Sequence, residues 1–267
     1  MEINNEYAIP IVRPQQVWPG LQAFCTTRIG GVGVAPYDTL NLGLGAGDVP
    51  QTVMANRQVL GNLVPSEPAW LKQVHGIRVV DADDPMIFAD EHSPPEADAS
   101  VTTHPERVLA VLTADCLSVV LSDEQGTVLG AAHAGWKGLA AGVLEETLAL
   151  MRQKQPLARS WRAWIGPGIG AASFQVGADV LEAFSAELSV QPDLCAPDAS
   201  LTERWRLDLA GLAQLRLQKM GVSSIEQSAS CTFTNPKYFF SYRRDRQTGR
   251  MATVAWLTHS PAAVSPD

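Results

Sequence analysis

Short apolar runs alternate with clusters of turn residues along the chain, and this pattern predicts buried β-strands. Residues 108–112 read Val-Leu-Ala-Val-Leu, and residues 117–121 read Leu-Ser-Val-Val-Leu. Runs of this length without strict polar alternation are typical of strands that are covered on both faces. The expected strands are 21–27, 70–74, 77–80, 108–112, 117–121, 128–132, 161–165, 228–233 and 251–257.

Apolar residues at helical spacing predict helices between these strands. Asp48 is suited to cap the first helix, and Pro50 fits its first turn. The expected helices are 50–62, 139–152, 178–188 and 206–220.

Strands, helices and glycine-rich turns alternate without an internal repeat and without a linker that divides the chain. This organisation predicts a single α/β domain over residues 1–267, with a core over about 18–258 and irregular or disordered ends. Strands follow one another directly between 98 and 134. We therefore expect mixed β-sheets, in an α+β arrangement, rather than pure βαβ winding.

The net charge and the composition argue against two classes of protein, nucleic-acid-binding proteins and membrane proteins. The 267-residue chain carries a formal net charge of −8, which argues against a general nucleic-acid partner but not against a small anion held by a few arginines. No apolar run approaches the ~20 residues that span a bilayer. The acidic start of the sequence lacks the pattern of a signal peptide. We expect a cytoplasmic protein that needs no membrane; a monomer would suffice, although the sequence leaves the oligomeric state open.

The four cysteines are scattered and form no CxxC pair, which favours free thiols over disulfides in a reducing compartment. One of them, Cys116, shares an unusual setting with His75 and His133: each stands at the edge of an apolar segment, where a strand meets a turn. Side chains placed in this way can meet at one point. A thiolate and two imidazoles predict a zinc site with an open fourth position, although copper accepts the same ligands. The metal-free alternative is a nucleophile, Cys116, with His133 as its base.

Two further regions are candidates for ligand contact. The glycine-rich loop after Arg28 does not fit a dinucleotide or P-loop pattern, but it could bring Arg28 and Asn41 to a ligand. Taken alone, Arg57 on the first predicted helix reads as a solvated surface charge.

Five peptides, in order, are similar to the YfiH family, which is also called DUF152 or the laccase-like multicopper polyphenol oxidase family. The resemblance covers roughly residues 18–258 and rests on CTTRIGGVGVAPYDTLNLG, KQVHG, TADC, AAHAGWKG and CTFTNPKYFFSYRRDRQTGRMATVAW. It implies a four-layer α/β/β/α fold shared with cysteine hydrolases. It also implies metal ligands at His75, Cys116 and His133, and pocket positions at Arg28, Asn41 and Arg57.

The resemblance implies a zinc-dependent purine nucleoside phosphorylase with adenosine deaminase activity. Phosphate would then attack the ribose, with Arg57, Arg28 or Lys137 holding the phosphate. The usual zinc deaminase signature is absent, so deamination would need another arrangement. Because the five histidines include no HxH pair, we do not expect laccase activity.

Two alternatives come from other classes. The family also includes a peptidoglycan editing factor, and this implies a cysteine- or metal-dependent amide hydrolase acting on misassembled peptidoglycan precursors. The second alternative is a metal-binding or ligand-binding protein without catalysis.

Overall fold

A computed structural model describes residues 3–4, 8–90 and 93–258. The disorder that we predicted after Thr258 falls outside these residues. No helix in the described ranges has the length and apolarity to cross a bilayer.

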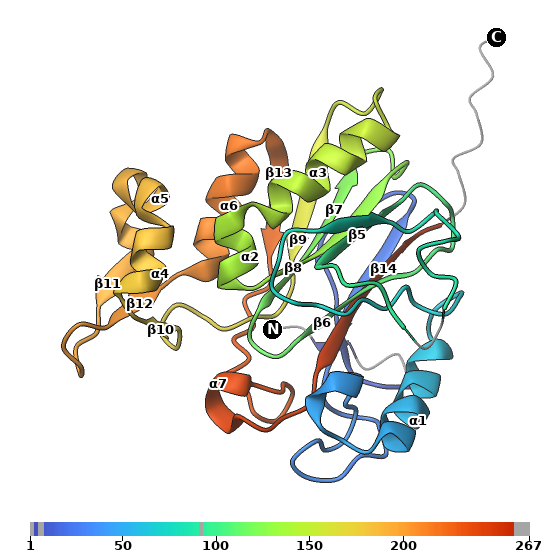
Figure 1. Cartoon of the computed structure of the whole chain (residues 1–267), viewed down its shortest axis with the longest axis horizontal. Coiled ribbons are helices and arrows are strands. Elements are labelled where there is room, and N and C mark those ends of the chain that lie inside the picture. The colour runs from blue at the N-terminus through green and yellow to red at the C-terminus, as the bar shows by residue number, and fades with distance from the viewer. Residues whose placement is uncertain (1–2, 5–7, 91–92, 259–267) are drawn as a thin grey trace.

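Two β-sheets form the centre of the molecule (Figure 1). The first is antiparallel and five-stranded, in the order β1 (Ile3–Asn4), β2 (Ile11–Val12), β3 (Leu21–Thr26), β14 (Met251–Leu257) and β6 (Leu109–Thr113). The second is mixed and six-stranded, in the order β13 (Val222–Gln227), β9 (Trp161–Ile165), β7 (Leu117–Asp123), β8 (Leu129–Ala134), β5 (Ala99–Thr102) and β4 (Val79–Asp81). In the second sheet, β13 runs parallel to β9 and β4 runs parallel to β5, while the other pairs are antiparallel.

The sheets pack face to face because successive residues of each strand point to opposite sides. On β7, Val120 points into the core between the sheets, and Ser118 donates to or accepts from Thr253 across that core at 2.7 Å. Leu117 and Val119 point to the opposite side, where helices cover them. Each such leucine or valine contributes roughly 1.5–3 kcal/mol when it leaves water.

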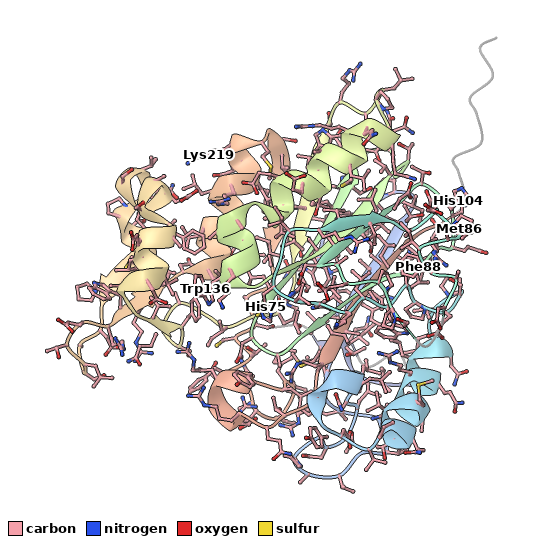
Figure 2. All side chains as sticks on the ribbon, viewed as in Figure 1. His75, Met86, Phe88, His104, Trp136 and Lys219 are labelled. Atoms are coloured by element: carbon pink, nitrogen blue, oxygen red, sulfur yellow. The ribbon has the colours of Figure 1, made fainter. Side chains whose placement is uncertain are left out.

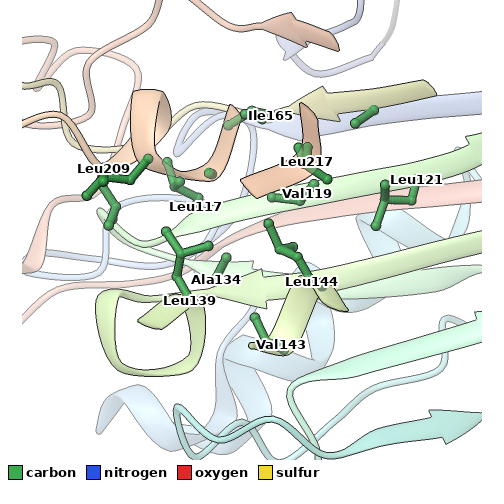
Figure 3. Packing of buried hydrophobic residues seen from close by; sticks show 14 of the residues in the cluster. Leu117, Val119, Leu121, Ala134, Leu139, Val143, Leu144, Ile165, Leu209 and Leu217 are labelled. Carbon is green, nitrogen blue, oxygen red and sulfur yellow. The ribbon is translucent and has the colours of Figure 1, made fainter. Parts of the chain in front are cut away.

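Helices cover the outer face of each sheet and complete four layers. The helices α3 (Val143–Lys154) and α6 (Leu209–Lys219) pack on the six-stranded sheet, and Figure 3 shows the apolar side chains between them. The helix α1 (Pro50–Gly61) packs through Leu60 on the five-stranded sheet. The expected α/β/β/α arrangement of one domain is therefore confirmed.

A smaller lobe projects from one side of the sheets (Figure 1). It has a three-stranded sheet and short helices, none of which the sequence pattern resolved correctly. The strands are β10 (Gln175–Val176), β12 (Trp205–Leu207) and β11 (Cys195–Pro197), and the helices are α4 (Ala178–Ala183) and α5 (Ser185–Val190). The predicted helix 178–188 is thus two helices that are interrupted at Phe184.

Several other boundaries differ from the prediction. The helix expected over 139–152 is divided into α2 (Trp136–Ala141) and α3, because Gly142 between them adopts φ +105°, which ends a helical turn. The strand expected over 228–233 is wrong: β13 ends at Gln227, and the following segment is a loop. The residues over 70–74 make only isolated bridges rather than a strand.

The N-terminal side of α1 also differs. Val49, rather than Asp48, is the cap residue of α1. The Asp48 carboxylate instead accepts hydrogen bonds from the Asn41 side chain at 3.0 Å and from the Val49 amide at 2.7 Å. The lead-in expected to be irregular contributes β1 and β2 to a sheet.

Candidate functional site

Three side chains with metal-binding atoms meet at one end of the six-stranded sheet. His75 lies in a loop, Cys116 lies in the turn between β6 and β7, and His133 lies on β8. Because Leu117 pairs with Ala134, the neighbouring Cys116 comes to the same end of the β7–β8 pair as His133. In the described part of the chain, no other group of three histidine, cysteine or acidic residues lies close enough to hold a metal ion.

The geometry of the three residues fits a tetrahedral metal. Their ligand atoms all lie within 4.8 Å of one another, and Cys116 Sγ lies 3.7 Å from His75 Nε2. Zinc bonds of about 2.0 Å to nitrogen and about 2.3 Å to sulfur place tetrahedral ligand atoms about 3.4–3.6 Å apart. The two imidazole rings meet edge to face, with centroids 4.7 Å apart. The residues therefore suit zinc or another metal that accepts nitrogen and sulfur.

A buried carboxylate, Asp98, fixes both histidines and was not predicted. It accepts hydrogen bonds from the backbone amides of Val74, His75 and Gly76 at 3.2, 2.9 and 2.7 Å. The same carboxylate lies 2.8 Å from Nδ1 of His133, which leaves Nε2 of that ring for the metal. Asp98 therefore fixes the His75 loop, whose φ of +62° is unusual for histidine, and orients the His133 ring.

Hydrogen bonding controls the charges of this group. Burial alone would raise the pKa of Asp98, but hydrogen bonds from His133 and from the amides of Gly76 and Val74 lower it. Burial likewise opposes ionisation of Cys116, yet His133 and His75 outweigh burial and lower the pKa of this thiol to about 6. Asp98 and Cys116 overcome burial of His133 and raise its pKa to about 9. The site thus favours a thiolate, which is the form that binds metals.

Gly135 leaves room for the side chains of His75 and Cys116. A Cβ atom at this position would lie 2.8 Å from Cδ2 of His75 and 3.0 Å from Sγ of Cys116. The backbone of Gly135 is extended, with φ −64° and ψ 157°, so other residues could adopt it. The requirement for glycine is therefore steric and comes from the site itself.

The three residues line a cavity of about 690 Å³. In Figure 2, His75 and Trp136, which both line this cavity, lie between the sheets and the α1 and α7 (Tyr242–Asp245) end of the molecule. Aromatic side chains form part of the wall, and arginines form another part. The aromatic residues are Trp70, Trp136, Phe174 and Tyr242, and the arginines are Arg57, Arg243, Arg246 and Arg250.

Of the predicted substrate residues, Arg57 reaches the cavity. Its guanidinium stacks on Trp70 at 3.9 Å from the ring centroid, and its Nε donates to the carbonyl of Leu42 at 3.1 Å. Burial, opposed by the charge of Glu67, lowers the pKa of Arg57 to about 10, so this side chain stays cationic at neutral pH.

The other predicted substrate residues lie elsewhere. Arg28 forms an ion pair with Asp38 at 3.0 Å and packs over the ring of Phe240. Lys137 is exposed, and its ammonium lies 5.7 Å from the ring centroid of Trp136. In the described part of the chain, neither residue lines the cavity.

Asn41 is fully buried and acts on the site indirectly. Its side-chain oxygen accepts hydrogen bonds from the backbone amides of Gly43 and Arg250, at 3.0 and 2.9 Å. Asn41 therefore holds Arg250 in place instead of lining the cavity itself.

A second buried carboxylate, Asp115, ties the cysteine turn to the C-terminal arginines. Its oxygens accept hydrogen bonds from the Thr232 hydroxyl and from the backbone amide of Arg243, each at 2.6 Å. Burial raises the pKa of Asp115 despite these hydrogen bonds. The sequence showed an aromatic and basic patch over 239–245 but gave no indication that it faces Cys116.

Comparison with known proteins gives the family of this chain. Residues 22–258 match the family described as multi-copper polyphenol oxidoreductase laccase. A Shigella flexneri protein named purine nucleoside phosphorylase YfiH is 44% identical over 253 residues, which are 92% of this chain and 98% of that protein. A purine nucleoside phosphorylase of Pseudomonas aeruginosa is 40% identical over 243 residues, which are 90% of this chain and 96% of that protein.

Solved structures give the same result. A Neisseria meningitidis protein of the DUF152 family superposes with a TM-score of 0.85 at 38% identity, covering 93% of this chain and 99% of that one. YlmD from Geobacillus stearothermophilus superposes with a TM-score of 0.84 at 28% identity, covering 97% and 100%. The fold, the motifs and these matches together show that the chain belongs to the YfiH (DUF152) family.

Proposed function

We propose that this protein is a metal-dependent purine nucleoside phosphorylase. The observation that carries the proposal is the position of the His75, Cys116 and His133 group, which lines the same cavity as four arginines. Relatives that share 40–44% of their residues with this chain are named purine nucleoside phosphorylases, which supports the same activity here.

The cavity offers the groups that phosphorolysis needs. A phosphate oxygen forms a bond to the anomeric carbon of ribose while the bond from that carbon to the purine nitrogen breaks, and the purine leaves with the electron pair and takes up a proton. Arg57 and Arg250 are suited to hold the phosphate, because guanidinium groups bind phosphate oxygens in pairs. Trp136 offers a flat apolar face for the purine, whereas the Trp70 ring carries the Arg57 guanidinium.

Zinc is the metal we propose, held by His75, Cys116 and His133. When bound, it supplies Lewis acidity to a substrate or water oxygen. Copper accepts the same ligands, but a thiolate with two imidazoles and an open fourth position is the ligand set of a catalytic zinc site. We propose adenosine deamination as a second activity of the same cavity, in which water replaces the amino group at C6 of the purine.

One observation favours a second candidate, a cysteine amide hydrolase. The pKa of Cys116 is lowered to about 6, mainly by His133 and His75 acting against burial, and this gives the thiolate that nucleophilic catalysis requires. In that case, the Cys116 thiolate would attack the carbonyl carbon of an amide in a peptidoglycan precursor without a metal. The carbon–nitrogen bond would break, the amine would leave with a proton from His133, and water would then hydrolyse the thioester and restore the thiol.

Metal content and nucleoside turnover, measured together on three proteins, test the proposal. Wild type should hold about one zinc per chain and release free purine base from inosine or adenosine only when phosphate is present. Cys116→Ser should lose both properties, and Cys195→Ser, a matched change outside the cavity lining among described residues, should retain both. A wild-type protein without metal, inert toward nucleosides and alkylated selectively at Cys116, would support the hydrolase instead.

A further inference from the structure

We propose that the α7 side of the cavity is a second anion subsite, formed by Arg243 and Arg246 and backed by Arg206. It would bind a phosphate monoester that the substrate itself carries. The inference rests on the proposed nucleoside function and deepens it: the substrates would include purine nucleoside 5′-monophosphates.

The charge of the cavity wall motivates the proposal. Four arginines and Lys72 line the cavity, against the single carboxylate of Asp115. Lys72 pairs with Glu96 at 3.3 Å, whereas none of the four arginines forms an ion pair with a carboxylate of the described residues. A chain with a net charge of −8 therefore concentrates unpaired positive charge in one cavity.

The arginines approach the cavity from opposite sides. Arg57 lies on α1, whereas Arg243 lies on α7 and Arg246 directly follows it. Figure 1 shows α1 and α7 separated from each other below the sheets. Burial lowers the pKa of Arg250, and the charges of Cys116 and Asp115 oppose this effect only in part, which places Arg250 near the cysteine turn. Arg57 and Arg250 can thus serve the reacting phosphate, and the α7 pair remains.

Like charges are held together on the α7 side. Burial lowers the pKa of Arg243, and the charges of Arg246 and Arg206 lower it further, although Asp115 opposes them. Backbone contacts hold these side chains: Nη1 of Arg243 donates to the carbonyl of Gln175 at 2.7 Å, and Nη1 of Arg206 donates to the carbonyl of Ala172 at 2.9 Å. Arg206 also pairs with Asp198 at 2.5 Å.

A bound anion would relieve this repulsion. A phosphate monoester carries a charge of about −1.5 to −2 at neutral pH and accepts hydrogen bonds from several guanidinium nitrogens. The reacting inorganic phosphate can be bound by about two arginines, Arg57 and Arg250. A second phosphate group, carried by the substrate, would then be bound by Arg243 and Arg246. The lobe that bears Arg206 would then form part of the binding site.

Turnover of inosine and of inosine 5′-monophosphate, compared in three proteins, tests the inference. Arg246→Gln removes one positive charge. Arg246 has a φ of +61°, and because arginine and glutamine are both unbranched at Cβ, the substitution should not change the backbone strain at this position. The matched control is Arg204→Gln, a change of equal charge at an exposed position on the lobe that bears Arg206, outside the cavity lining among described residues.

Wild type should have a lower KM for the monophosphate than for inosine, by roughly tenfold for one charged contact. Arg246→Gln should lose most of that advantage and leave inosine turnover within about twofold, and Arg204→Gln should behave as wild type. Equal KM values for the two substrates in wild type, or an equal loss on both in Arg246→Gln, would overturn the inference.

Calorimetric binding separates this inference from the proposed phosphorolysis. If neither compound is turned over, the proposed function fails. Binding of inosine 5′-monophosphate that exceeds binding of inosine, and that Arg246→Gln weakens roughly tenfold, would still support the subsite. Absence of that difference would overturn the subsite, whatever the turnover.

Discussion

The two halves of the cavity are built on opposite plans. On the metal side, every charged group has a partner: Asp98 pairs with His133, and His133 and His75 face Cys116. Along the rest of the cavity wall, which we call the arginine side, the guanidinium groups of Arg57, Arg243, Arg246 and Arg250 form no ion pair with a carboxylate of the described residues. The protein itself therefore supplies the charged partners around His75, Cys116 and His133, whereas a negatively charged ligand would have to supply the partners of the four arginines.

A buried aspartate supports each half. Asp98 is fully buried, and its pKa is lowered because hydrogen bonds outweigh burial. Asp115 is 9% exposed, and its pKa is raised because burial outweighs its hydrogen bonds. If the two halves act independently, a change at Asp98 should alter the affinity for zinc, and a change at Asp115 should alter the KM for the phosphorylated substrate.

The largest effect is expected from Asp98→Asn. The amide cannot accept hydrogen bonds on its nitrogen, so it cannot serve both the backbone of the His75 loop and Nδ1 of His133. Loss of such an orienting carboxylate should weaken zinc binding by about 10–100-fold. Competition with a chelator measures this affinity. A variant that binds zinc as tightly as wild type would show that Asp98 does not position the ligands.

Gly135→Ala tests the metal side by steric means and should have the next largest effect. Its methyl group would lie 2.8 Å from Cδ2 of His75 and 3.0 Å from Sγ of Cys116, which is too close, while the extended backbone at this position tolerates alanine. We expect roughly a tenfold loss in zinc affinity, with little change in thermal stability. The matched control is Gly61→Ala, at a position where an added Cβ meets no atom within 4 Å. Equal zinc affinities in the two variants would contradict the steric argument.

Asp115→Asn should affect the arginine side. The positive φ of 104° at this position suits asparagine, whose nitrogen can donate to the Thr232 hydroxyl. Its neutral oxygen, however, accepts the hydrogen bond from the Arg243 amide more weakly than a carboxylate does, so α7 is held less firmly. The resulting displacement of α7 should raise the KM for the phosphorylated substrate several-fold, roughly three- to tenfold, and leave zinc affinity within about twofold. Both constants are measured on the same variant. If zinc affinity falls by a larger factor than the KM rises, the two halves of the cavity do not act independently.

The smallest effects separate Arg57 from Lys137. Arg57→Lys keeps the charge but loses the stacking on Trp70 and the paired donors, so the KM for phosphate should rise about fivefold. Lys137→Ala removes an exposed charge and should stay within about twofold of wild type. Phosphate saturation curves measure both. A stronger effect at Lys137 than at Arg57 would show that the phosphate binds near Lys137 instead.

The grouping of His75, Cys116 and His133 was predictable because its signals are local. Cys116 and His133 end or begin apolar runs that can only be strands, and adjacent antiparallel strands bring such ends together. His75 was assigned from its own motif, although the segment before it is not a strand. The layered fold followed from the same runs together with the family resemblance.

The supporting residues were not predictable from local pattern. Asp98 is one polar residue before a short strand, and its role appears only when the His75 loop and β8 meet around it. Arg243 and Arg246 line the same cavity as Cys116, and Arg243 is held there by a hydrogen bond from its backbone amide to Asp115, which lies more than 100 residues away in the sequence. Such long-range placement leaves no periodic signal in the sequence. Arg28 is a different case: the resemblance implied a pocket position, but its side chain pairs with Asp38 and, among the described residues, is not part of the cavity lining.

The most direct test of the account is a zinc titration of metal-free protein, followed by phosphate-dependent release of hypoxanthine from inosine. We predict that activity rises in proportion to bound zinc and saturates near one zinc per chain, because the described residues hold one group that could bind it, His75, Cys116 and His133. Full activity without metal, or zinc bound at this site with no phosphate-dependent release, would contradict the account.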